Sequence, residues 1–123
     1  MGMKVFILFA MIFAHIVDDY YLQGVLAKMK QKKWWNENAP DKLYKYDYIA
    51  ALIAHAFSWS FMINVPTLFV SNKYSVMCAF IAINTIVHAF IDNTKANCHL
   101  INLICDQICH IIQIVGLWLA VVA

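Results

Sequence analysis

The sequence contains no arginine and carries little charge of either sign. All nine basic residues among its 123 are lysines, and charged residues make up only 13% of the chain, about half of their share in soluble domains. The formal net charge of +2 is small, and the lysines do not follow a face long enough to track a phosphate backbone. The composition therefore gives no reason to expect a nucleic-acid partner.

The sequence also lacks the pattern of a disulfide framework and the cleavage site of a signal peptide. The four cysteines form no CxxC pair, and three of them fall inside apolar stretches, so we expect no disulfide framework. The apolar run from Val5 to Ala14 follows Lys4 and imitates a signal peptide. No small-x-small cleavage site precedes a soluble domain. We therefore expect this run to be an uncleaved signal-anchor helix.

Apolar residues dominate what remains. They make up 63% of the chain, against about 45–50% in soluble domains, and they gather into four segments of roughly 20 residues, the length of a membrane-spanning helix. Lipid requires every backbone polar group to be paired within the segment, which favours helices. The predicted fold is an all-α integral membrane four-helix bundle, a single transmembrane domain over residues 1–123. The predicted helices cover about 5–26, 46–70, 74–94 and 100–123, and a loop covers 27–45.

The lysines predict the orientation of this bundle. Six of the nine lie in the 27–45 connection, and basic loops stay on the cytoplasmic side of a membrane. Four crossings then leave both termini outside. We expect a multi-pass protein of the inner (cytoplasmic) membrane, with Trp34 and Trp35 at the membrane interface.

Histidine and aspartate recur at a fixed spacing in these apolar segments. Three pairs are separated by four residues, which places both members of a pair on one face of a helix. The second segment contributes one further histidine. The seven residues are His15, Asp19, His55, His88, Asp92, Asp106 and His110.

The depths of these residues suggest that they meet. With a rise of about 1.5 Å per residue, all seven lie about 5–16 Å from the cytoplasmic ends of their helices. Neutral imidazoles and carboxylates are ligands of zinc, the expected cofactor, and also of manganese and iron. We therefore predict that all seven bind metal, with Asp19, His55 and Asp92 also catalytic.

Other polar residues are predicted to lie near the metal site without binding the metal, or are weaker candidates as ligands. Gln23 and Lys95 are expected to orient a substrate, although Lys95 could instead extend to the membrane interface. Asp18 is a weaker candidate because it points roughly 100° away from Asp19 on an α-helix. His99 is expected near the cytoplasmic turn, exposed to water.

Three sequence blocks resemble an uncharacterised family of small bacterial and phage membrane proteins. His15 to Gln23 is similar to an HxxxD-aromatic-x-LQ signature, His88 to Lys95 to an HxxxDxxK block, and Asp106 to His110 to a DQxxH block. His55 fits the remaining histidine, and Tyr20 replaces the more usual phenylalanine. The resemblance implies a four-helix membrane protein without an assigned activity. A more distant likeness is to small inner-membrane proteins described as metal-dependent hydrolases.

These observations predict a metal-dependent hydrolase that acts on a lipid or lipid-linked phosphate or ester near the cytoplasmic face. Membrane lipid is the expected partner and the source of the substrate, and a homodimer is compatible with so small a bundle. One alternative is a proton or divalent-ion transporter that uses the same residues. A second alternative is a non-catalytic membrane interaction protein whose polar cluster only locks the helices together.

Overall fold

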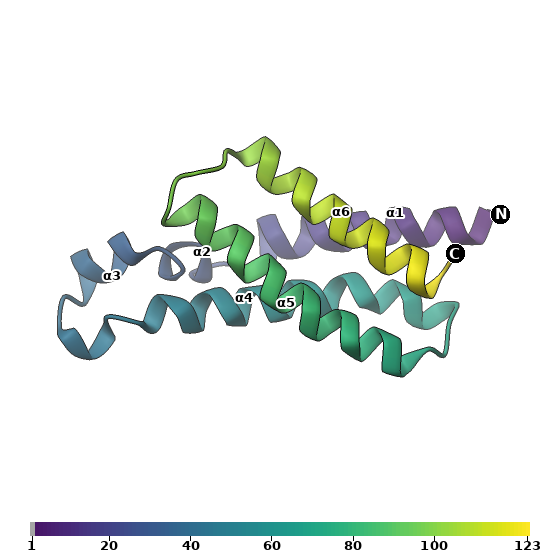
Figure 1. Ribbon diagram of the computed structural model, residues 1–123, viewed down its shortest axis with the longest axis horizontal. Coiled ribbons are helices and arrows are strands. Elements are labelled where there is room, and N and C mark those ends of the chain that lie inside the picture. The colour runs from purple at the N-terminus through teal and green to yellow at the C-terminus, as the bar shows by residue number, and fades with distance from the viewer. Residues whose placement is uncertain (1) are drawn as a thin grey trace.

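The computed structural model describes residues 2–123, and every regular element among them is helical. In chain order the elements are α1 (Gly2–Ile16), the π-helical segment η1 (Val17–Leu22), α2 (Leu26–Met29), α3 (Lys32–Asn38), the 3-10 turn η2 (Lys42–Tyr44), α4 (Asp47–Asn64), the 3-10 segment η3 (Val65–Phe69), α5 (Tyr74–Ala96) and α6 (Leu103–Val121). Figure 1 shows them as an elongated bundle.

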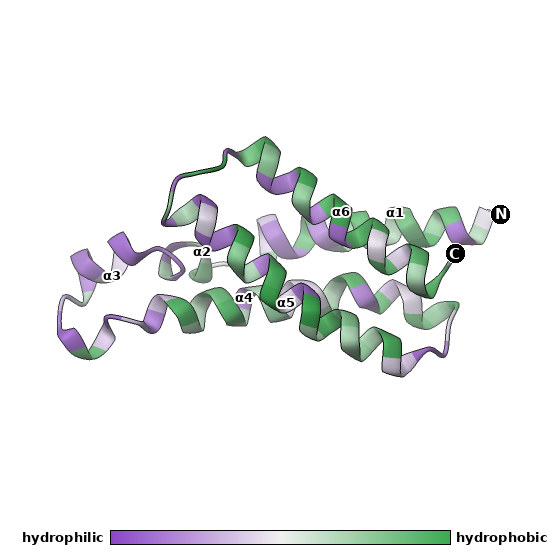
Figure 2. Cartoon of the chain, viewed as in Figure 1, coloured by the Kyte–Doolittle hydropathy of each residue, from purple (hydrophilic) through white to green (hydrophobic). Residues whose placement is uncertain are grey.

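Four helical stretches are long and apolar enough to cross a membrane. They are Gly2–Leu22, Lys42–Phe69, Tyr74–Ala96 and Leu103–Val121. Figure 2 shows that hydrophobic residues dominate these stretches, while hydrophilic residues gather around α3 and at places within the bundle. The pattern is that of a multi-pass membrane protein, as the sequence predicts.

The number of helices differs from the prediction. The described chain has six α-helices where the sequence predicts four, because the 27–45 connection folds into α3 and contains most of α2. The first spanning stretch ends at Leu22 and not near residue 26. Gly24 follows with φ of +51°, a left-handed conformation that glycine adopts without strain and that turns the chain out of the helix.

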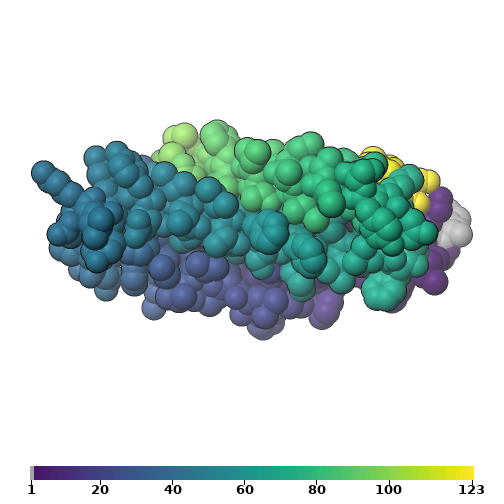
Figure 3. Space-filling view, turned by 90° about the horizontal axis from the view of Figure 1, so that it is seen from below, coloured from purple at the N-terminus to yellow at the C-terminus, as the bar shows by residue number. Residues whose placement is uncertain are grey.

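Both termini lie at one end of the bundle, and α3 lies at the other (Figure 1). The Lys4 ammonium donates to the carbonyl of Ala123 at 3.0 Å, and the Trp118 indole donates to the carbonyl of Lys4 at 2.9 Å. The space-filling view shows the same long shape, with the 30–50 region forming one end (Figure 3). An even number of crossings produces this arrangement.

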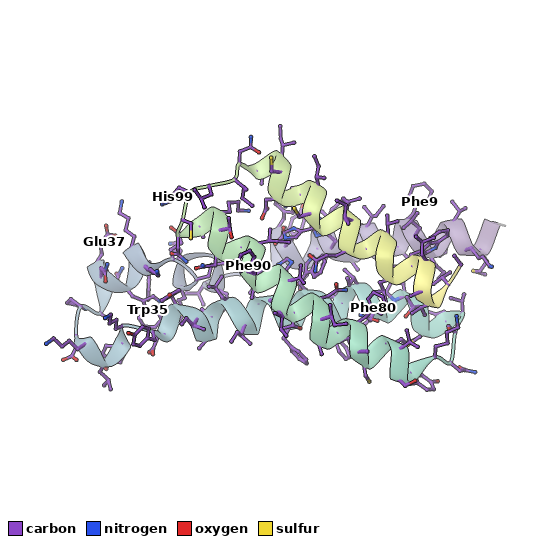
Figure 4. All side chains as sticks on the ribbon, in the orientation of Figure 1. Phe9, Trp35, Glu37, Phe80, Phe90 and His99 are labelled. Carbon is purple, nitrogen blue, oxygen red and sulfur yellow. The ribbon has the colours of Figure 1, made fainter. Side chains whose placement is uncertain are left out.

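An apolar core fills the half of the bundle nearest the termini. Residues from all four spanning stretches pack there, and they include Met11, Trp59, Met77 and Leu117. The outer surface is also apolar: Phe9 and Phe90 are 65% and 71% exposed, and Phe9 lies at the outer edge of the bundle in Figure 4. Lipid can cover such side chains, so apolar residues lie both inside and outside the bundle, whereas ionisable side chains within the spans are confined to its interior.

Candidate metal centre

Below the apolar core, the bundle encloses a group of ionisable side chains that we call the His/Asp cluster. Its members come from α1, η1, α4, α5 and α6, and each is at most 6% exposed. All seven predicted metal residues lie in it, together with Asp18, which the sequence analysis ranked lower. The members are His15, Asp18, Asp19, His55, His88, Asp92, Asp106 and His110. Figure 4 shows side-chain nitrogen and oxygen atoms gathered inside the bundle.

Three ligand atoms form a small triangle at the centre of the cluster. His55 Nε2 lies 3.2 Å from His88 Nε2 and 3.5 Å from Asp92 Oδ2, and His88 Nε2 lies 3.8 Å from the same oxygen. Two ligands of one tetrahedral zinc ion are separated by about 3.3–3.6 Å, given bonds of about 2.0–2.2 Å. The triangle therefore has dimensions suited to a single ion.

Asp19 adds a further ligand atom beside this triangle. Its Oδ1 lies 3.2 Å from His55 Nε2, and Asp19, His55 and His88 offer three atoms that lie within 4.8 Å of one another. The same holds for His88, Asp92 and His110, and for His15, Asp19 and His110. Asp19, His88 and His110 each belong to two of these groups, so the groups overlap in one continuous constellation.

His110 faces the second oxygen of Asp92. Its Nε2 lies 3.8 Å from Asp92 Oδ1 and 3.8 Å from Asp106 Oδ1. Neither ring nitrogen of His110, nor either of these oxygens, has a hydrogen-bond partner among the described residues. Buried polar atoms are normally paired, so these atoms are suited to hold a cation or its ligands.

His15 is the exception among the predicted ligands. The Trp59 indole donates to His15 Nδ1 at 2.7 Å, which requires that nitrogen to be unprotonated. His15 Nε2 then carries the proton and donates to Gln107 Oε1 at 3.0 Å. Because both nitrogens are committed, His15 orients its neighbours in this arrangement and does not offer a free lone pair to a metal.

Asp18 is buried because η1 is not an α-helix. A π-helical segment is wound more widely than an α-helix, so Asp18 and Asp19 both turn inward and are 0% and 6% exposed. Ser58 Oγ donates to Asp18 Oδ1 at 2.6 Å, and His55 Nδ1 lies 3.9 Å from Asp18 Oδ2. Asp18 is thus a buried carboxylate beside His55, contrary to what α-helical spacing suggests.

Two lysines reach the cluster from the end of the bundle that carries α2 and α3. Lys30, at the end of α2, places its ammonium 2.6 Å from Asp92 Oδ2 and is 6% exposed. Lys95, on α5, places its ammonium 2.6 Å from Asp106 Oδ2. Sequence reasoning treated Lys30 as one of several loop charges, and only the turn at Gly24 brings α2 back over the cluster.

The two predicted substrate-orienting residues are engaged within the protein. Lys95 forms the ion pair with Asp106. Gln23 donates to the backbone carbonyl of Asp19 and so helps to end η1. Gln107, which the sequence analysis did not select, instead links the cluster members: its amide nitrogen lies 3.2 Å from Asp19 Oδ2 and 3.0 Å from Asp106 Oδ2. His99 is exposed, as expected, and points away from the cluster (Figure 4).

A groove on the side of the bundle leads to this cluster. It lies between α1 with η1 and α6, and its volume is about 510 Å³. Its lining is mostly apolar, and the polar side chains of His15 and Gln107 belong to it, as do Tyr20 and Tyr21. The groove is formed by the spanning segments themselves, so in a bilayer it opens to lipid.

The chain belongs to the family described as Protein of unknown function (DUF3307), which matches residues 7–123. This confirms the resemblance to an uncharacterised family that the sequence blocks indicate. No curated protein and no solved structure matches the chain. The likeness to metal-dependent hydrolases and the link to phages therefore stay predictions.

Proposed function

We propose that this protein binds a divalent metal ion, zinc in the first instance, inside the membrane and hydrolyses a lipid-borne phosphate or ester. The observation that carries the proposal is the triangle of His55 Nε2, His88 Nε2 and Asp92 Oδ2, whose edges are 3.2, 3.5 and 3.8 Å. A structural network needs paired donors and acceptors. Two imidazole nitrogens aimed at each other and at one oxygen suit a shared cation better.

The residues of the cluster have distinct tasks in this proposal. His55, His88 and Asp92 would hold the ion, and Asp19 would supply either a fourth ligand or the base that accepts a proton from water. When bound, zinc would supply Lewis-acid polarisation of the scissile group and a lower pKa for water. Hydrolysis adds the hydroxyl of water to the phosphorus or acyl carbon, and the proton goes to the leaving oxygen.

The groove supports a substrate that arrives through the lipid. Its apolar walls include Ile12 and Ile111, which lie about 12–15 Å from the loop-side ends of their spanning segments. Tyr20, Tyr21 and Gln107 lie closer to the loop side. A hydrocarbon chain along the apolar walls would therefore bring its polar linkage to Gln107 and His15, next to the cluster. The lysine-rich loop supports the proposal that this end faces the cytoplasm.

Transport of protons or ions by the same residues has less support. Above the cluster, Met11, Ile114 and Leu117 are each 0% exposed and pack in an apolar core, and the buried polar residues there, such as Asn64 and Asn84, carry no charge. A path through one chain needs hydrated or titratable groups along its length. Flux of zinc or protons into proteoliposomes would favour transport, and hydrolysis without flux would favour the proposal.

The first test is metal content. The protein is purified in mild detergent without chelator and its zinc, manganese and iron are measured by inductively coupled plasma mass spectrometry. We expect stoichiometric metal in the wild type and a loss of at least 100-fold in metal affinity for His88→Gln. His99→Gln is the matched control, because His99 is exposed, and it should retain the metal.

Two further measurements distinguish a catalytic metal centre from a purely structural network. His15→Gln should weaken metal binding by about 10–100-fold without abolishing it, the usual effect of a residue that orients ligands. Phosphate or fatty-acid release from phosphatidic acid and diacyl lipids in mixed micelles should be lost in His88→Gln and kept in His99→Gln. A folded wild type without metal, even after incubation with zinc, would reject the metal centre and favour a purely structural network.

A further inference from the structure

The charges within the cluster do not balance. Four carboxylates are buried there, those of Asp18, Asp19, Asp92 and Asp106. Two lysines, Lys30 and Lys95, are paired with two of them. With neutral imidazoles, two negative charges remain inside a membrane-spanning bundle. Uncompensated buried charge is strongly unfavourable, and one divalent ion supplies the missing charge.

The two lysines stand where further cations would bind. Lys30 Nζ contacts Asp92 Oδ2, the oxygen that also faces His55 and His88. Lys95 Nζ contacts Asp106 Oδ2, while the other oxygen of Asp106 faces His110. Even without His15, the seven other ligand-type side chains exceed what one tetrahedral ion needs, and Asp92 presents one oxygen to His55 and His88 and the other to His110.

Lys30 is also held in place by contacts outside the cluster. Asn97, just after α5, donates from Nδ2 to the carbonyl of Lys30 at 3.0 Å and accepts from the backbone N–H of Lys32 at 2.7 Å. These bonds tie α2 to the end of α5. The ammonium of Lys30 is therefore a fixed part of the site and does not sample the interface as a free loop lysine does.

We propose that Lys30 and Lys95 are built-in counter-ions that restrict this site to one divalent metal ion and occupy the positions of a second. The proposal rests on the metal centre proposed above and specifies its stoichiometry. A carboxylate oxygen has lone pairs for both a metal and an ammonium, so Lys30 and the ion share Asp92. Without the lysines, the constellation has the charge and the ligands for two divalent ions.

The test counts metal ions in the full-length protein. Wild type and variants are incubated with excess zinc in mild detergent and desalted. Bound zinc is then measured by inductively coupled plasma mass spectrometry, with protein quantified by amino-acid analysis. We expect one zinc per chain in the wild type and two in Lys30→Met/Lys95→Met. Lys30→Arg/Lys95→Arg, which keeps both charges, and Lys33→Met, at a lysine whose side chain is 81% exposed, should each bind one.

A second variant can overturn the proposal even where the double methionine variant does not fold. Lys95→Met/Asp106→Asn removes one carboxylate and its lysine together, so the remaining charge is unchanged and no ion is left unpaired. It should still bind one zinc. A loss of zinc from this folded variant would make Asp106 a required ligand and overturn the proposal.

The remaining outcomes separate this inference from the proposed function. Two ions in the wild type would leave the metal centre standing and overturn the role of the lysines. One ion in both the wild type and a folded double methionine variant would do the same. No ion in the wild type would remove the proposed function and the inference with it.

Discussion

Replacing Trp59 with phenylalanine should uncouple α4 from α1 at the edge of the His/Asp cluster. The Trp59 indole donates to His15 Nδ1 at 2.7 Å, and its ring stacks on His88 with centroids 4.3 Å apart. Phenylalanine retains an aromatic ring beside His88 and removes the donor. His15 Nδ1 is then left without its partner in a region closed to water.

The expected size of this coupling follows from the geometry. A hydrogen bond contributes about 0.5–1.5 kcal/mol net, and polar contacts between membrane helices average about 0.6 kcal/mol with a maximum near 1.7 kcal/mol. The Trp59–His15 bond is short, and the two residues are 0% and 2% exposed. We therefore expect a coupling of about 1 kcal/mol, near the upper part of the measured range.

A double-mutant cycle isolates that energy from the cavity that the smaller ring leaves. Trp59→Phe, His15→Leu and the combined variant are unfolded reversibly by SDS in bicelles, and their free energies of unfolding are compared with the wild type. Trp59→Phe combined with Phe9→Leu serves as the control, because Phe9 is on the outer surface and its effect should add. A Trp59–His15 coupling no larger than the additivity error of about 0.3 kcal/mol would refute the bond and the assigned tautomer of His15.

Three further substitutions test the fold around the cluster. Ser58→Ala should lower the free energy of unfolding by about 1.5–3 kcal/mol, because Ser58 donates to the buried Asp18 carboxylate at 2.6 Å; an unchanged value would place Asp18 elsewhere. Gly24→Ala should destabilise by about 1–2 kcal/mol because φ is +51°. No contact is closer than 3.9 Å, so a clash cannot cause the loss; a gain in stability would contradict the turn. Leu117→Ala should cost about 2–5 kcal/mol in the same unfolding assay, whereas Leu119→Ala, on the outer surface, should cost less, and equal losses would contradict the core.

The membrane-spanning part of the fold could be predicted from hydropathy because lipid imposes one requirement on every residue of a span. The convergence of His55, His88 and Asp92 could also be anticipated, since helix rise and connectivity determine depth. The division of the 27–45 connection into α2 and α3 could not be predicted, because short polar helices depend on tertiary contacts such as those of Asn97 with the Lys30 carbonyl and the Lys32 amide.

Three residues in or beside the His/Asp cluster could not be placed correctly from the sequence, each for a structural reason. Asp18 was ranked low because α-helical spacing was assumed where the chain is π-helical. Lys30 could not be distinguished from Lys28 or Lys33 by composition, since the direction of α2 depends on one left-handed residue. Gln107 stands beside Asp106 in sequence, and its role as a link between Asp19 and Asp106 appears only when α1 and α6 are packed together.

The pairing of Lys95 with Asp106 bears on how the protein enters the membrane during synthesis. A lone aspartate or lysine in a nascent span adds up to about 2.5–3.5 kcal/mol to its insertion free energy, and the full cost applies at the centre of the span. Lys95 and Asp106 lie on opposite sides of the short connection between α5 and α6, so the two helices can leave the translocon as a hairpin whose charges already compensate each other. Asp18 and Asp19, in η1, face His55 and His110 instead of a lysine. These contacts need α4 and α6, so the first span gains its polar partners only when the later helices have been inserted.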